Sequence, residues 1–143
     1  MTAFDLQMPF LYWPDETLVS VSRLLGRPAY VFRFQPPASF AAQRPDVAGV
    51  QVHFDTQYKA PRQTELLGPA GVLKTVTVND VKLMDGHPAI VKEVDVRNEA
   101  TRDKTRYEVT AAAVGLDLLP ALFTPAELGA AVAPPADNLI VHF

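Results

Sequence analysis

Apolar and polar residues alternate with a period of two along most of the chain. The alternation is unbroken in Val50-Gln51-Val52-His53-Phe54-Asp55, and it recurs around residues 76–79, 94–97 and 106–110. Successive side chains of a strand point to opposite faces, so this pattern predicts strands that are buried on one face only. One-sided burial is typical of antiparallel sheets.

Turn-forming residues separate the alternating runs at hairpin length. Examples are Gly26-Arg27-Pro28, Gly68-Pro69-Ala70-Gly71 and Asp85-Gly86-His87-Pro88. Such connections join neighbouring antiparallel strands, so we expect about seven strands arranged as a meander. The expected strands are residues 17–25, 29–35, 50–55, 62–67, 72–81, 89–97 and 104–113.

Two segments depart from the strand pattern. Prolines occur in residues 35–45 and exclude a central strand there, so we expect a loop with a short turn near 39–43. Near the end, Thr124-Pro125-Ala126-Glu127-Leu128 has the cap residue and the early proline of a short helix. The prediction is a mainly β domain over residues 1–131 with one or two short helices. A linker or tail follows at 132–143, where 139–141 would add an edge strand.

Composition narrows the choice of function. The 143 residues are 48% hydrophobic, which suits one domain with a core, and the net charge of -3 comes without a basic patch for nucleic acid. No apolar run approaches the roughly 18 to 20 residues that span a bilayer. The start of the chain does not read as a signal peptide, so the protein is either cytosolic or this chain begins downstream of one.

The residues that usually carry chemistry show no catalytic or metal-binding spacing. The three histidines stand far apart, the serines form no nucleophile motif, and there are no cysteines. His53 falls on the polar face of its strand, where we expect it to be solvated. We therefore expect no catalytic residues, no metal and no cofactor, and place an enzyme last among the three functional classes considered.

The apolar face of the expected sheet needs a cover. Only one short helical segment is expected to provide it, which indicates a missing partner, a missing segment or a ligand. Aromatic residues are frequent on that face and near the start of the chain. Candidate ligand-lining residues are Phe32, Phe34, Val50, Val52 and Phe54, with Trp13 nearby at the rim. The pattern alone does not separate those that fill a core from those that line a site.

Several stretches, in order, resemble the outer-membrane lipoprotein-sorting and carrier family (LolA-like). They span residues 4–128 and comprise Phe4-Asp5-Leu6, Trp13-Pro14, Leu25 to Val31, His53-Phe54-Asp55 with Pro61 and Leu66, Leu73 to Val81, Lys104-Thr105-Arg106 and Leu119 to Leu128. The usual tryptophan of the 52–54 strand is absent or replaced by Phe54. Family members are longer, so the chain is similar to their C-terminal part and lacks the further strands and the covering helix.

The resemblance implies an incomplete, curved antiparallel barrel with an apolar inner surface. In that family the surface shields lipoprotein acyl chains in the periplasm, so lipid acyl chains or a lipoprotein are the expected partners and the cell envelope is the expected location. The alternative is a protein-interaction or envelope-sensor module on the same scaffold. We also expect a homodimer, through sheet edges or apolar faces, because the 17–25 strand carries only Arg23 as a protective charge.

Overall fold

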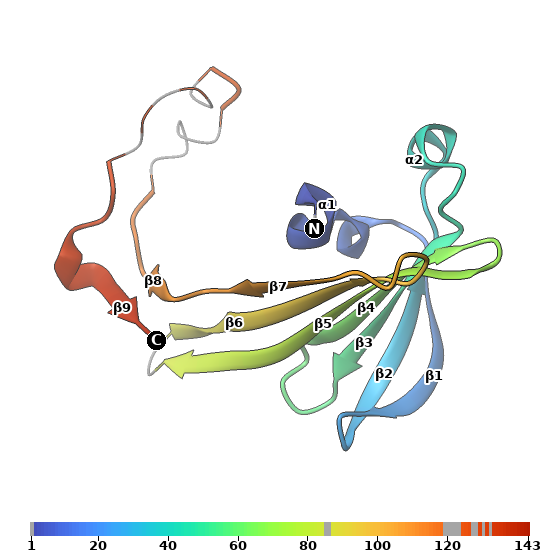
Figure 1. The fold of residues 1–143 in the computed structure, drawn as a ribbon, viewed down its shortest axis with the longest axis horizontal. Coiled ribbons are helices and arrows are strands. Elements are labelled where there is room, and N and C mark those ends of the chain that lie inside the picture. Colours follow the sequence, from blue (N-terminus) through green and yellow to red (C-terminus); the bar gives the residue numbers. More distant parts are fainter. Residues whose placement is uncertain (1, 85–86, 119–123, 127–128, 130, 132) are drawn as a thin grey trace.

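The computed structural model describes residues 2–84, 87–118, 124–126, 129, 131 and 133–143. Its main feature is a seven-stranded antiparallel sheet in which strands adjacent in sequence are adjacent in space (Figure 1). The strands are β1 (Glu16–Leu24), β2 (Arg27–Phe34), β3 (Gly49–Asp55), β4 (Pro61–Gly68), β5 (Gly71–Met84), β6 (His87–Asn98) and β7 (Lys104–Glu108). The mainly β fold and the meander are therefore confirmed.

The last expected strand is wrong as a single element. Residues 104–113 divide into β7, which pairs with β6, and β8 (Ala111–Ala113), which leaves the sheet. β8 pairs instead with β9 (Ile140–His142), within the segment expected as a tail. The main-chain N–H of Val109 still bonds to the carbonyl of Lys92 on β6, so the chain turns away just past that point. The proposed domain boundary at residue 131 stays a prediction.

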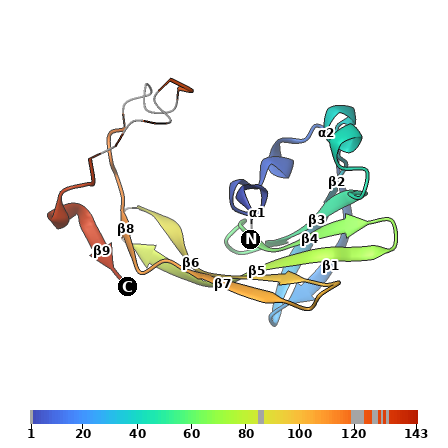
Figure 2. The ribbon, with the colours of Figure 1, turned by 45° about the horizontal axis from the view of Figure 1, so that its top comes forward.

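The sheet is curved and open, with a concave face and a convex face (Figure 2). Among the six strand pairings that the structure describes in this sheet, four contain a shift in register. One shift lies between Leu18 and Ser20 in the pairing of β1 with β2, and another lies between Val78 and Asp80 in the pairing of β5 with β6. Extra residues of this kind bend the strand that carries them and increase its twist. Asp80 lies within the long strand β5. The bends at these shifts contribute to the curvature of the sheet toward its concave, apolar face.

Short helices lie on the concave side. α1 (Ala3–Gln7) and η1 (Pro9–Tyr12), a 3-10 turn, precede β1 and sit above the concave face (Figures 1 and 2). The expectation that the chain lacks a cover for this face is wrong in part, because this N-terminal segment supplies one. The expectation of a loop with a turn near 39–43 is wrong, because the prolines flank this stretch without interrupting it and it forms the helix α2 (Ala38–Gln43). A 3-10 turn, η3 (Asp137–Leu139), precedes β9. The helix expected at 124–128 includes residues outside the described ones.

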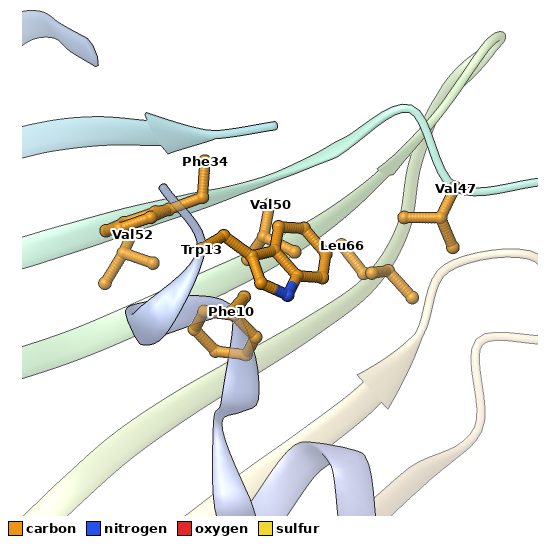
Figure 3. Packing of buried hydrophobic residues seen from close by; sticks show 7 residues of the cluster. All are labelled: Phe10, Trp13, Phe34, Val47, Val50, Val52 and Leu66. Carbon is orange, nitrogen blue, oxygen red and sulfur yellow. The ribbon is translucent and has the colours of Figure 1, made fainter. Parts of the chain in front are cut away.

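The main core forms where the N-terminal segment meets β2, β3 and β4. Figure 3 shows Phe10 and Trp13 against the strand side chains. The buried cluster consists of Phe10, Trp13, Phe34, Val47, Val50, Val52 and Leu66. Val50 and Val52 have no exposed surface. Trp13 also packs on Phe40 of α2 with ring centroids 5.0 Å apart. A second cluster, Val76, Val78, Val94 and Val96, lies on β5 and β6.

A buried ion pair fixes α1 to the sheet. Lys74 of β5 donates to both carboxylate oxygens of Asp5 at 2.9 Å, and the Asp5 side chain is 4% exposed. Burial alone raises the pKa of Asp5, but the hydrogen bonds from Lys74 and Thr2 outweigh it and leave the pKa below its usual range. A buried charge needs such partners, so the pair defines where α1 can dock.

Candidate functional site

An apolar pocket opens on the concave face over β2 and β3, beside the main core. Its volume is about 520 Å³, within the range of small-molecule sites. It is lined by Leu11, Glu16, Tyr30, Phe32, Phe34, Phe54, Asp55, Thr56 and Lys59. Phe32 and Phe54 stand edge to face with centroids 5.7 Å apart. The floor is therefore aromatic, and the charged residues of the lining are Glu16, Asp55 and Lys59.

The pocket exists because the N-terminal segment covers only part of the concave face. Where α1 and η1 lie, the remaining void is about 10 Å³ and is bounded by residues such as Phe10, Val50 and Val76. That is about the space of one water molecule. Leu11 of η1 stands at the boundary, since it lines the open pocket and also packs against the core. The concave face is therefore filled by side chains under α1 and η1 and open over the remaining part of β2 and β3.

The structure divides the six residues expected to line a lipid site into two groups. Phe32, Phe34 and Phe54 line the pocket, and Phe34 is at the same time a buried member of the core. Val50 and Val52 are fully buried, and Trp13, expected at the rim, is 8% exposed inside the core. The division follows the path of η1, which crosses over the valines and leaves the far ends of β2 and β3 uncovered.

Sequence reasoning missed several pocket residues, most notably Tyr30. Tyr30 alternates with Phe32 and Phe34 along β2, so it belongs to the same face, and its register partner on β3 is Phe54. The period-two pattern therefore contained this signal. Lys59 carried no comparable signal, because it lies in the β3–β4 turn and reaches the pocket only through the tertiary fold.

The convex face carries a polar cluster around His53. Its Nδ1 lies 3.4 Å from the Ser22 hydroxyl, and its Nε2 lies 3.9 Å from a carboxylate oxygen of Glu65. The neighbouring His53 ring holds the pKa of Glu65 below its usual range. The His53 side chain is only 12% exposed, so the expectation of a solvated histidine is wrong. Gln51 also contacts both His53 and Glu65.

This cluster is separate from the apolar pocket. His53 alternates with Val52 and Phe54, so it points to the other side of the sheet. Within the described residues, no group of three histidine, aspartate or glutamate side chains is placed to hold a metal ion. The same part of the chain contains no helix with the length and apolar character to cross a membrane.

Comparison with known proteins supports the fold. No protein-family model matches the chain, and a search of curated proteins finds no match. A putative outer membrane lipoprotein-sorting protein domain from Vibrio parahaemolyticus matches with a TM-score of 0.55 and 17% identity, over 64% of this chain and 37% of that one. A DUF1329 family protein from Desulfovibrio piger matches at 0.57 and 12%, over 80% and 46%.

A LolA superfamily protein from Nitrosomonas europaea gives a TM-score of 0.55 and 14% identity, over 82% of this chain and 51% of that one. At these identities the likeness concerns the fold. The chain spans 37–51% of the length of these solved structures. It has the curved antiparallel fold of lipoprotein-sorting and LolA-superfamily structures, as its sequence resemblance indicated.

Proposed function

We propose that the chain is a non-catalytic carrier domain that holds a lipid acyl chain, free or attached to a lipoprotein, in the concave pocket. The observation that supports this most directly is an open pocket of about 520 Å³ with an aromatic floor, directly beside the core, where a void under the N-terminal segment measures only about 10 Å³. A fully packed concavity would need no ligand. Here the apolar surface continues beyond the core, and no segment among the described residues covers it.

Binding of an acyl chain at such a site does not require a polar anchor. Each acyl CH₂ removed from water contributes about 0.8 kcal/mol, so a smooth apolar pocket can hold a chain without a catalytic or coordinating group. The half-buried rings of Phe32 and Phe54 would supply contact area. Glu16 and Lys59 line the same pocket and would face the polar end of the cargo.

The cell envelope, in particular the periplasm, is the proposed place of action. Two of the structures with this fold are named for lipoprotein sorting or for the LolA superfamily. A lipid that crosses an aqueous compartment must have its acyl chains covered, and the pocket geometry suits that task. Nucleic acid is not among the proposed partners, because the net charge is -3 without a basic patch.

The alternative is a protein-interaction or envelope-sensor module on the same scaffold. A concave face completely filled by side chains would favour it, because binding would then use another surface. Side chains fill the concave face over Val50 and Val52, but the face is open over Tyr30 and Phe54. The open region is why the carrier is the preferred proposal.

The test is the affinity of a fluorescent fatty-acyl probe for two matched tyrosine variants. Tyr30 lines the pocket and is 46% exposed, whereas Tyr107 on β7 lies outside it and is 39% exposed. We expect Tyr30→Asp to raise the Kd about tenfold or more, since a carboxylate would be desolvated against the chain. Tyr107→Asp should leave the Kd unchanged.

Circular dichroism would establish that both variants keep the sheet. Equal affinity in folded Tyr30→Asp and wild-type protein would contradict this site. Absence of probe binding to the wild-type protein would contradict the carrier itself and favour the interaction module.

A further inference from the structure

β1 is an edge strand of the sheet, and several of its exposed side chains are apolar. It pairs with β2 on one side, and nothing in the described residues pairs with its other side. Leu18, Val19 and Val21 are 51–63% exposed. The other edge of the sheet, β7, has the sequence Lys-Thr-Arg-Tyr-Glu, and charges of this kind protect an edge from pairing. Among the strands that the structure describes, only β1 combines a long free edge with apolar side chains.

We propose that β1 pairs antiparallel with β1 of a second copy, in the register that places Glu16 of one copy opposite Arg23 of the other. The same two-fold arrangement sets Leu18 opposite Val21, and Thr17 opposite Ser22. Each of these contacts occurs twice by symmetry. The proposed partner is therefore the chain itself, and the argument for it is the self-complementarity of charge and apolar surface along one strand.

The shift in register within β1 makes this pairing consistent with the faces of the sheet. Strict alternation would put residues 16 and 23 on opposite faces. The shift between Leu18 and Ser20 leaves Val19 as an extra residue, so that Leu18 stands opposite Phe32 and Val21 opposite Tyr30. Phe32 and Tyr30 share the concave face.

The same register also places the two charged residues of β1 on the concave face. Glu16 stands opposite Phe34 and Arg23 opposite Pro28, on that concave side. Oppositely charged residues that face each other across paired strands attract, whereas like charges repel. The ends of β1 thus match their counterparts in the second copy, and the apolar residues between them are covered.

Pairing at this edge would also extend the concave surface. Glu16 lines the apolar pocket, and Val21 is the register neighbour of Tyr30, another pocket residue. The exposed side chains of Leu18 and Val21 therefore continue the pocket floor toward the edge. In the dimer two such floors would meet at the two-fold axis.

Charge reversal at the two ends of β1 tests the proposal. Sedimentation equilibrium should show a dimer for the wild-type chain, and Glu16→Arg or Arg23→Glu should each weaken it about tenfold or more, because two attractive pairs become repulsive. The double variant Glu16→Arg/Arg23→Glu should return the Kd to within about threefold of wild type. Glu108→Arg on β7 is the matched control and should change nothing.

A disulfide test reports the register independently of charge. The chain has no cysteine, so Thr17→Cys and Ser22→Cys introduce single thiols. A mixture of the two variants should form the mixed disulfide dimer faster than either alone. A monomer at several hundred micromolar would overturn the proposal, as would a dimer that none of the β1 reversals weakens. A dimer weakened by both single reversals but not restored by the double variant would overturn the register.

Discussion

At the scale of single residues, the convex face is organised by carboxylates that have several donors each. Asp95 on β6 accepts hydrogen bonds from Arg106 and Asn79, and Lys104 lies 2.8 Å from it. The hydrogen bonds from Arg106 and Lys104 hold the pKa of Asp95 well below its usual range. Asp95 therefore links β7 to β6 and β5 through side chains as well as through the ladder.

This arrangement predicts acid sensitivity. A carboxylate whose pKa is lower in the folded chain stabilises the fold above its unfolded-state pKa of about 3.9, and that contribution is lost as the pH falls through the lower folded value. We expect Asp95→Asn to lower the free energy of unfolding at pH 7. The difference from wild type should shrink steadily below about pH 4, when urea unfolding is measured as a function of pH.

Asp80→Asn is the control, because the Asp80 side chain is 59% exposed and its nearest cation, on Lys92, is 4.0 Å away. An exposed pair of this kind contributes little, so this variant should follow the wild type at every pH. A constant penalty for Asp95→Asn from pH 7 to pH 2 would show that its charge is not the cause.

At the scale of elements, the N-terminal segment closes the core and sets the limit of the pocket. Phe10 is 2% exposed and contacts the rings of Phe4, Trp13 and Phe34 with centroids 5.6–6.4 Å apart. α1 has only five residues, too few for a helix that is stable alone. Its place depends on these contacts and on the pair between Asp5 and Lys74.

Replacing Phe10 tests this role. We expect Phe10→Ala to lower the free energy of unfolding by about 3–5 kcal/mol, because it removes a buried ring and leaves a cavity. Leu6→Ala on the same segment is the control, since Leu6 is 50% exposed, and should cost less than about 0.5 kcal/mol. Similar losses in both variants, measured by urea unfolding, would show that the segment is not docked as described.

At the scale of the whole molecule, one curved sheet serves as both core and candidate binding surface. The two regions differ in what covers them, not in the strands that form them. β2 contributes Phe34 to both, and β3 contributes Val52 to the core and Phe54 to the pocket. A ligand would therefore extend an existing apolar core rather than occupy a separate chamber.

This continuity predicts a dependence on acyl length. In a series of saturated fatty acids, Kd should fall about fourfold with each added methylene, which follows from about 0.8 kcal/mol per CH₂. The trend should level off once the chain exceeds the pocket of about 520 Å³. Displacement of the fluorescent probe measures it. An affinity independent of chain length would contradict an acyl site and point to recognition of the polar end.

The strands and their order could be predicted from the sequence, because period-two alternation and turn residues are local signals. The edge position of the first strand was also expected, but residues 39–43 were expected as a turn and form the helix α2. Residues 104–113 could not be divided correctly, because β8 is a strand only through its pairing with Ile140–His142, far away in sequence. α1 was missed because its five residues carry too little periodicity to register as a helix.

For the candidate site, the sequence by itself determined which residues share the apolar face of β2 and β3, since alternation assigns a face to each side chain. It did not separate Val52 from Phe54, which have the same pattern and the same face. Only the tertiary structure decided that η1 and Trp13 cover the first and leave the second open. The physical reason is that alternation is a property of one strand, whereas burial depends on which distant segment packs upon it.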